Sequence, residues 1–144
     1  MKEQLEKLIE FHRTFGHPIE TAPCSQSDNL GYLRHRLGLE ELDEYVRGNE
    51  NDDPVEIADA LTDQLYILLG TMVAHGMQNI IEDLFDEVHR SNMSKLGEDG
   101  KPIYREDGKV LKGPNYFKPN LGKIVHDEWA RQASQLEIPF DEKV

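Results

Sequence analysis

The sequence predicts an all-α protein: a bundle of four main helices, followed by a short loop or hairpin and an extra helix. Three observations favour this class. Apolar residues recur at helical spacing in four segments, the connections between these segments are short, and the alternation of strands and helices that marks α/β proteins is absent. With 144 residues the chain fits one domain. We expect its core over residues 3–96, a basic glycine-rich loop over 97–119, and a final helix and tail over 120–144.

The first helix is predicted over residues 3–15, where apolar residues recur at helical spacing on one face. Gly16 and Pro18 follow the segment, and both residue types are typical of a helix end. Residues 17–26 are expected to form a loop.

The second helix is predicted from Ser27 or Asp28 to Arg47, before a polar turn with the sequence GNENDD. One face of this helix is apolar even though the segment contains two glycines. The apolar stripe consists of Leu30, Leu33 and Leu37.

The third helix has the clearest predicted start. Asp53 can accept backbone N–H groups as the N-cap, Pro54 suits the first helical position, and Glu56 occupies the acidic position of a capping box. Gly76 is a plausible end. The main apolar stripe is expected to consist of Ile57, Leu61, Leu65, Leu68 and Met72.

The rest of the chain predicts a fourth helix, a turn-rich segment and a final helix. The fourth helix is expected over Asn79–Lys95 and the final one over Leu121–Ala133. Between them the tetrapeptide EDGK occurs twice, and its Asp-Gly pairs favour tight turns, so we expect a small hairpin or ordered loop. The inward face of the fourth helix is predicted to carry Ile81, Leu84, Phe85 and Val88.

Composition excludes several classes of function. The net charge of −12 would repel phosphate backbones, so duplex nucleic acid is not an expected partner. No apolar run reaches the length of a membrane span, and the N-terminal residues lack the apolar stretch of an export signal. Cys24 has no second cysteine with which to form a disulfide. We therefore expect a cytoplasmic protein without a membrane partner.

Carboxylates occupy positions on two helices where burial is expected. On the second helix, Glu41 and Glu44 continue the leucine stripe and Glu40 lies at its border; on the third, Asp59 and Asp63 are one turn apart. A buried, unpaired carboxylate is costly, so a compensating charge is needed. Divalent cations such as Mg²⁺ and Mn²⁺ prefer oxygen ligands. The sequence therefore predicts a metal site between the two helices, and a solvated acidic surface is the simpler alternative.

Two further groups of residues are candidates for contact with a phosphorylated ligand. Asn92 and Lys95 extend the inward face of the fourth helix, where an amide followed by an ammonium group suits a nucleotide. Lys109 and Lys112 lie in the glycine-rich loop, where ammonium and backbone N–H groups favour oxyanions. The alternative is that Asn92 caps a helix end and the lysines are solvated.

The order of motifs resembles a known superfamily. The run EELDE provides an EExxE motif and is followed by DALTDQLYILLGT, EVHRSNMSK and DGKVLKGPNYFKP. This order is similar to that of the all-α nucleoside triphosphate pyrophosphohydrolases of the MazG-like superfamily, which includes dimeric dUTPases and phosphoribosyl-ATP pyrophosphohydrolase. The likeness spans residues 11–119 and is greatest to the branch with dUTPase activity, which shares an FHR segment near its start.

The resemblance implies Mg²⁺-dependent hydrolysis of a nucleoside triphosphate between the α and β phosphates, with dUTP as one candidate substrate, and a homodimer or higher homo-oligomer. By position, Glu41 and Glu44 match the first pair of metal ligands and Glu40 matches the extra acid before them, which we expect to orient or deprotonate the attacking water. Asn92 and Lys95 match the substrate-contacting Asn and Lys of the family, and we expect Lys109 and Lys112 to contact phosphate as well. The second metal motif, ExxD, fits Glu56 with Asp59 literally, but the later spacing favours Asp59 with Asp63.

Two other functions remain open from the sequence. Phosphoribosyl-ATP hydrolysis would share the metal chemistry with a bulkier substrate. A helical metal-binding or interaction module would bind cations without turnover.

Overall fold

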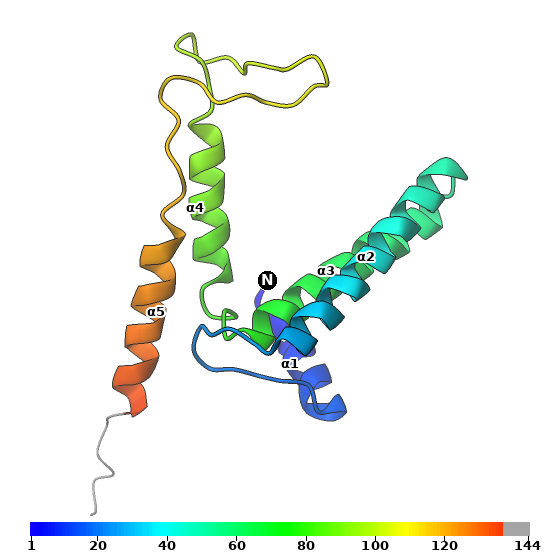
Figure 1. The fold of residues 1–144 in the computed structure, drawn as a ribbon, viewed down its shortest axis with the longest axis vertical. Helices are drawn as coiled ribbons and strands as arrows, with labels where there is room; N and C mark the ends of the chain where they lie inside the picture. Colours follow the sequence, from blue (N-terminus) through cyan, green and yellow to red (C-terminus); the bar gives the residue numbers. More distant parts are fainter. Residues whose placement is uncertain (137–144) are drawn as a thin grey trace, which may run out of the picture. The chain divides into compact units, whose positions relative to one another are not determined.

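The computed structural model describes residues 1–136, and within that range the regular elements are helices apart from a single β-bridge between Tyr104 and Val110. The predicted all-α class is confirmed (Figure 1). The structure consists of two compact units, one of residues 1–78 and one that begins at Asn79. The helices are α1 (Lys2–Phe15), α2 (Asp28–Glu50), α3 (Pro54–Ala74), α4 (Ile81–Met93) and α5 (Leu121–Leu136).

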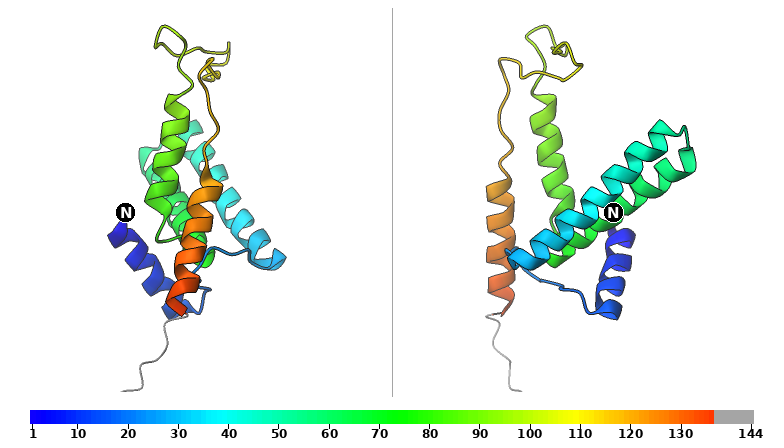
Figure 2. Two further views of the ribbon diagram at one scale, coloured as in Figure 1. Left: turned by 90° about the vertical axis from the view of Figure 1, so that its left-hand side faces the viewer. Right: turned by 45° about the vertical axis from the view of Figure 1, so that its right-hand side comes forward.

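The first unit is a long helical hairpin with a third helix packed on it. α2 and α3 run side by side along most of their length, and α1 packs mainly on α3 (Figures 1 and 2). The hairpin closes tightly at Gly48, where an added Cβ would lie 3.0 Å from the backbone nitrogen of Ile57. This close approach brings the C-terminal half of α2 against the N-terminal half of α3.

The predicted helix starts in this unit are confirmed by their caps. The hydroxyl of Ser27 accepts the N–H of Leu30, and the carboxylate of Asp53 accepts the N–H groups of Val55 and Glu56. These bonds satisfy donors that a helix N-terminus would otherwise leave unpaired. The reciprocal half of the predicted capping box is not formed, because the Glu56 carboxylate lies 3.5 Å from Arg47 instead.

The buried face of α3 differs from the predicted one. Ala60, Leu69 and Val73 are buried, whereas the leucines of the predicted stripe are about half exposed. Small residues let α1 and α2 approach α3 closely, and this close packing decides which face is covered. The exposed part of the predicted stripe consists of Leu61, Leu65 and Leu68.

α3 also corrects the expectation about membrane spans. By length and composition it is long and apolar enough to cross a membrane, with a mean hydropathy of 1.2 over its best window. It carries Asp59 and Asp63, and one face packs on α1 and α2. The core helix of a soluble protein passes the same test, so this property is weak support for a membrane location.

The loop between α1 and α2 is held against the end of α3. The backbone N–H of Cys24 donates to the carbonyl of His75, and the amide of Gln26 donates to the carbonyl of Ala74 at 2.7 Å. Gly76 follows with φ +70°, and an added Cβ there would lie 2.1 Å from the carbonyl oxygen of Ala22. Only glycine suits both this backbone angle and this space.

The second unit pairs α4 with α5 through an irregular segment that contains a small hairpin. The second EDGK sequence forms its turn, since the N–H of Arg105 donates to Lys109 and the N–H of Leu111 donates to Ile103. Two predicted inward residues of α4 are exposed, Phe85 at 65% and Val88 at 37%, whereas Ile81 is buried. The side-chain amide of Asn79 donates to the buried carboxylate of Glu128 at 3.0 Å and so anchors α5.

Gly76→Ala should destabilise the protein, because the methyl group would meet the Ala22 carbonyl at a left-handed backbone angle. We expect a loss of about 2–4 kcal/mol of unfolding free energy, measured by urea denaturation with circular dichroism. Gly31→Ala is the matched control: nothing lies within 4 Å of an added Cβ, so stability should rise by roughly 0.5–1 kcal/mol. Wild-type stability in Gly76→Ala would contradict the close contact.

Candidate active site

Four carboxylates from the two helices of the α2–α3 hairpin gather around that of Glu41. Glu40, Glu41 and Glu44 lie on the C-terminal half of α2, and Asp59 and Asp63 lie on the N-terminal half of α3. The amide of Gln64 donates to the backbone carbonyl of Glu41 at 3.2 Å and so sets the register between the helices.

Burial and like charges together raise the pKa of Glu41. Burial is the largest cause, and the carboxylates of Glu44, Asp63, Asp59 and Glu40 add to it, in that order. The Oε2 atom of Glu41 is enclosed and has no hydrogen-bond partner among the residues that the structure describes. The four neighbours are not equally covered: Glu44 is half-buried, and the other three are exposed. The ionised cluster therefore lacks a compensating charge at its most enclosed atom.

Glu56 pairs with an arginine that it shares with Glu44. Arg47 lies 3.2 Å from the carboxylate of Glu44 and 3.5 Å from that of Glu56. The guanidinium thus links Glu56 to Glu44, but Glu56 is not among the carboxylates that raise the pKa of Glu41. Of the two acids that the ExxD motif left open, Asp63 contributes to the raised pKa of Glu41, whereas Glu56 does not and pairs with Arg47.

The predicted substrate contacts lie in the second unit. Asn92 is exposed near the end of α4, and Lys95 is half-buried but follows the helix rather than lying on it, because α4 ends at Met93. The N–H of Gly113 donates to the Lys95 carbonyl at 2.9 Å, which brings the backbone beside Lys112 to the end of α4. Lys109 is exposed in the small hairpin of the second unit.

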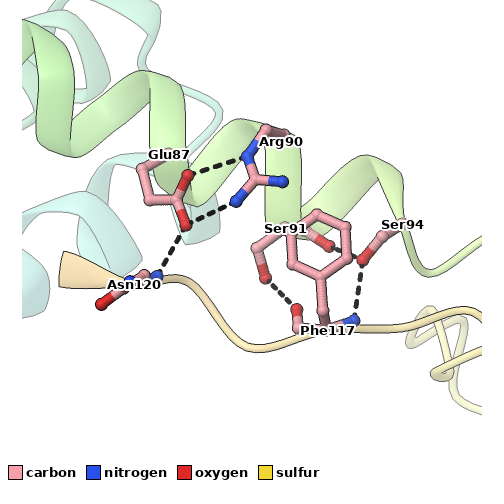
Figure 3. A network of polar contacts seen from close by, with 6 residues as sticks. All are labelled: Glu87, Arg90, Ser91, Ser94, Phe117 and Asn120. Atoms are coloured by element: carbon pink, nitrogen blue, oxygen red, sulfur yellow. Dashed lines mark hydrogen bonds and ion pairs between the residues drawn. The ribbon is translucent and has the colours of Figure 1, made fainter. Parts of the chain in front are cut away.

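A polar network holds the segment that follows the small hairpin of the second unit on α4 (Figure 3). The sequence analysis did not identify this network. Glu87 accepts bonds from Arg90 and from the backbone N–H of Asn120, at 2.6 Å. Ser91 donates to the carbonyl of Phe117, and Ser94 accepts its N–H. The sequence predicted that Asn92 and Lys95 face inward. The residues that bond to the neighbouring segment are instead Ser91 and Ser94, each one position earlier, because small hydroxyls reach a neighbouring backbone directly.

Comparison with known proteins assigns the chain to a family. Residues 8–92 match the sequence profile of phosphoribosyl-ATP pyrophosphohydrolase, which is more than half of the chain. The chain belongs to the phosphoribosyl-ATP pyrophosphohydrolase family. The superfamily that the motifs resemble is therefore confirmed, and the chain is a nucleotide pyrophosphohydrolase rather than a non-catalytic module. The matched region includes all five clustered carboxylates and ends before Lys95.

Other comparisons add a structural relative of this pyrophosphohydrolase. A crystal structure from Exiguobacterium sp. 255-15, provisionally described as an NTP pyrophosphohydrolase, is 28% identical in sequence. The alignment covers 92% of this chain and 97% of that one, with a TM-score of 0.47. No curated protein sequence matches the chain.

The carboxylate cluster of this pyrophosphohydrolase fits a divalent cation in its chemistry. Its donors are carboxylate oxygens, which suit Mg²⁺ and Mn²⁺, and the enclosed Oε2 of Glu41 lacks a partner. In the part of the chain that the structure describes, no three His, Cys, Asp or Glu side chains are grouped closely enough to hold an ion as they stand. A cation would therefore have to draw the side chains together.

Glu41→Gln should raise the thermal stability of the metal-free pyrophosphohydrolase at neutral pH, because an amide removes a charge from the repulsive cluster. Since the pKa of Glu41 is raised by folding, ionisation favours the unfolded state, so wild-type stability should increase as pH falls toward the folded pKa. We expect Tm to rise by about 2–4 °C in the variant, with a weaker dependence on pH. Calorimetry in chelator measures this, and exposed Asp43→Asn is the control. A lower Tm for Glu41→Gln would contradict repulsion.

Proposed function

We propose that this enzyme hydrolyses a nucleoside or deoxynucleoside triphosphate, with dUTP as one candidate, to a monophosphate and pyrophosphate with Mg²⁺ as cofactor. The observation that carries the proposal is the gathering of four carboxylates around Glu41, whose enclosed Oε2 has no partner in the described part of the chain. A cluster that repels itself would be tolerable if bound cations neutralised its charge.

Each member of the cluster has a distinct part in this proposal. Glu41, Glu44, Asp59 and Asp63 would hold Mg²⁺, or Mn²⁺ in its place. When bound, Mg²⁺ offsets the negative charge of the phosphates and acidifies water. Glu40 is exposed beside the cluster and would accept the proton of the attacking water. Oxygen from water then bonds to the α-phosphorus while the bond to the bridging oxygen breaks, and pyrophosphate leaves.

Asn92 and three lysines are the further residues that we propose for substrate binding. Asn92 would donate to the sugar or base, and Lys95, Lys109 and Lys112 would contact phosphate oxygens. Two observations support a role for this segment. The backbone beside Lys112 is fastened to Lys95, and an added Cβ at Gly113 would lie 2.0 Å from the carbonyl oxygen of Leu96, so the segment has a defined conformation.

Phosphoribosyl-ATP is the second candidate substrate. The matching family profile favours it directly, and the same carboxylates would serve the same cleavage. A substrate panel separates the two candidates.

The decisive experiment measures pyrophosphate release from purified protein with Mg²⁺, across the natural deoxynucleoside triphosphates, dUTP and phosphoribosyl-ATP. We expect release that stops in chelator and returns with Mg²⁺ or Mn²⁺, because the cluster needs a cation to bind phosphates. Glu41→Gln should reduce kcat/KM at least about 100-fold, since cation contacts stabilise the transition state by several kcal/mol. Full activity in chelator would refute the metal site.

Asp63→Asn and Glu56→Gln form a matched pair that tests the second metal motif. The charge of Asp63 contributes to the raised pKa of Glu41, whereas Glu56 pairs with Arg47. Asp63→Asn should therefore lower kcat/KM by about 100-fold or more, and Glu56→Gln by less than about 10-fold. The same steady-state assay measures both variants. The reverse order would assign Glu56 with Asp59 to the metal.

We also propose that two copies of the chain associate through the exposed leucine face of α2 and α3. This face lines a groove of about 660 Å³ that includes Leu42 and Leu65, which are 49% and 47% exposed. Contiguous apolar surface of this kind is typical of a protein interface. Leu65→Asp should convert a dimer into a monomer in sedimentation experiments, whereas Val55→Asp, at an exposed position outside the groove, should not. A wild-type monomer would refute the proposal.

A further inference from the structure

The tetrapeptide EDGK occurs twice in the second unit, and its two copies form similar turns. In the first copy the carboxylate of Asp99 accepts the backbone N–H of Lys101 at 3.0 Å. In the second copy the carboxylate of Asp107 accepts the backbone N–H of Lys109 at 3.1 Å. The glycine after each aspartate has a left-handed backbone, with φ of 73° in the first copy and 83° in the second. The same four residues in the same kind of turn therefore allow a direct comparison.

The two aspartates differ in what else holds their carboxylates. The guanidinium of Arg105 donates two bonds to Asp107, one from Nε at 2.9 Å and one from Nη2. The residue at the corresponding position of the first copy is Gly97, and no cation of the described residues pairs with Asp99. Both side chains are exposed to water. Only the carboxylate of Asp107 is therefore fixed by a charged partner.

An aspartate that precedes a glycine can close a ring on its own backbone. The backbone nitrogen of the glycine attacks Cγ, and the hydroxyl group of the protonated carboxyl leaves as water together with the amide proton. Water then opens the five-membered succinimide at either carbonyl, and opening at the α-carbonyl routes the chain through Cβ as isoaspartate. Glycine favours the attack because it has no Cβ to obstruct the nitrogen and is conformationally free.

The attacking nitrogen is engaged alike in both copies. The N–H of Gly100 donates to the carbonyl of Gly97 at 3.0 Å, and the N–H of Gly108 donates to the carbonyl of Arg105 at 2.9 Å. These backbone bonds slow both sites to a similar degree. The difference in reactivity therefore depends on the carboxyl group.

Arg105 opposes two requirements of the reaction at Asp107. Hydroxyl leaves only from a protonated carboxyl group, and the bonds from Arg105 and from the N–H of Lys109 lower the pKa of Asp107. The side chain must also turn until Cγ reaches the nitrogen of Gly108, which would break both guanidinium bonds. A surface ion pair changes such an equilibrium by about two- to five-fold.

We propose that Asp99 is a site of spontaneous isoaspartate formation in the folded protein and that Arg105 protects the identical tetrapeptide at Asp107. The reaction adds a methylene to the backbone and so disturbs the turn in which the N–H of Gly97 donates to the carbonyl of Lys101 at 2.8 Å. The product presents a free α-carboxylate in an exposed turn, which is the group that isoaspartyl carboxyl methyltransferases modify.

The test incubates the purified protein at neutral pH and locates isoaspartate by peptide mapping with electron-transfer fragmentation. We expect isoaspartate to accumulate about two- to five-fold faster at Asp99 than at Asp107. Arg105→Met should raise the rate at Asp107 to that at Asp99. Arg36→Met, which removes an exposed guanidinium on α2, is the matched control and should leave Asp107 slow. Equal rates in the folded wild type, or no isoaspartate at Asp99, would overturn the proposal.

The same incubation in urea separates the effect of the fold from that of the sequence. Both copies have the same four residues, so they should react at similar rates once the fold no longer holds Arg105 on Asp107. An unchanged difference in urea would assign it to the flanking sequence and refute protection by Arg105. Circular dichroism checks that Arg105→Met folds. If it does not, Arg105→Lys keeps the charge without the planar fork and should raise the rate at Asp107 in part; an unchanged rate would refute the role of the fork.

Discussion

Close packing of α2 on α3 controls the rest of this enzyme's first unit, because it forces like charges together. Gly48 and the small residues of α3 let the two helices approach, and the approach encloses Oε2 of Glu41 while leaving it without a partner. Hydrophobic burial over the length of the hairpin outweighs the local repulsion. The fold thus holds a charge arrangement that would not assemble on its own, which is a common property of sites that bind cations.

The same packing divides α3 into two apolar faces with different environments. The face with Ala60, Gly70 and Val73 is covered within the chain, and the face with Leu61 and Leu65 stays exposed. A helix that is apolar on both sides needs a second covering surface. This is why α3 resembles a membrane span in composition, and why a partner subunit is a reasonable occupant of the exposed face.

The second unit relies on polar contacts to a greater extent. The segment that follows the small hairpin is fastened to α4 by bonds to Glu87, Ser91 and Ser94. The guanidinium of Arg90 lies over the ring of Phe117, 4.3 Å from its centroid. Glu128 is buried yet its pKa is lowered: burial alone would raise the pKa, but bonds from Asn79, Arg131 and Gln132 outweigh it. These contacts give the glycine-rich segment a defined conformation without an extensive apolar core.

The sequence by itself determined the helical class, most helix boundaries and the acids that gather between α2 and α3, because these depend on local spacing and on caps such as Ser27 and Asp53. Tertiary structure alone decided which face of α3 is covered and which hydroxyls hold the segment at α4. It also placed His12 beside Arg34, residues 22 positions apart. These features depend on how closely backbones approach across helices, and periodicity along one helix carries no information about that distance.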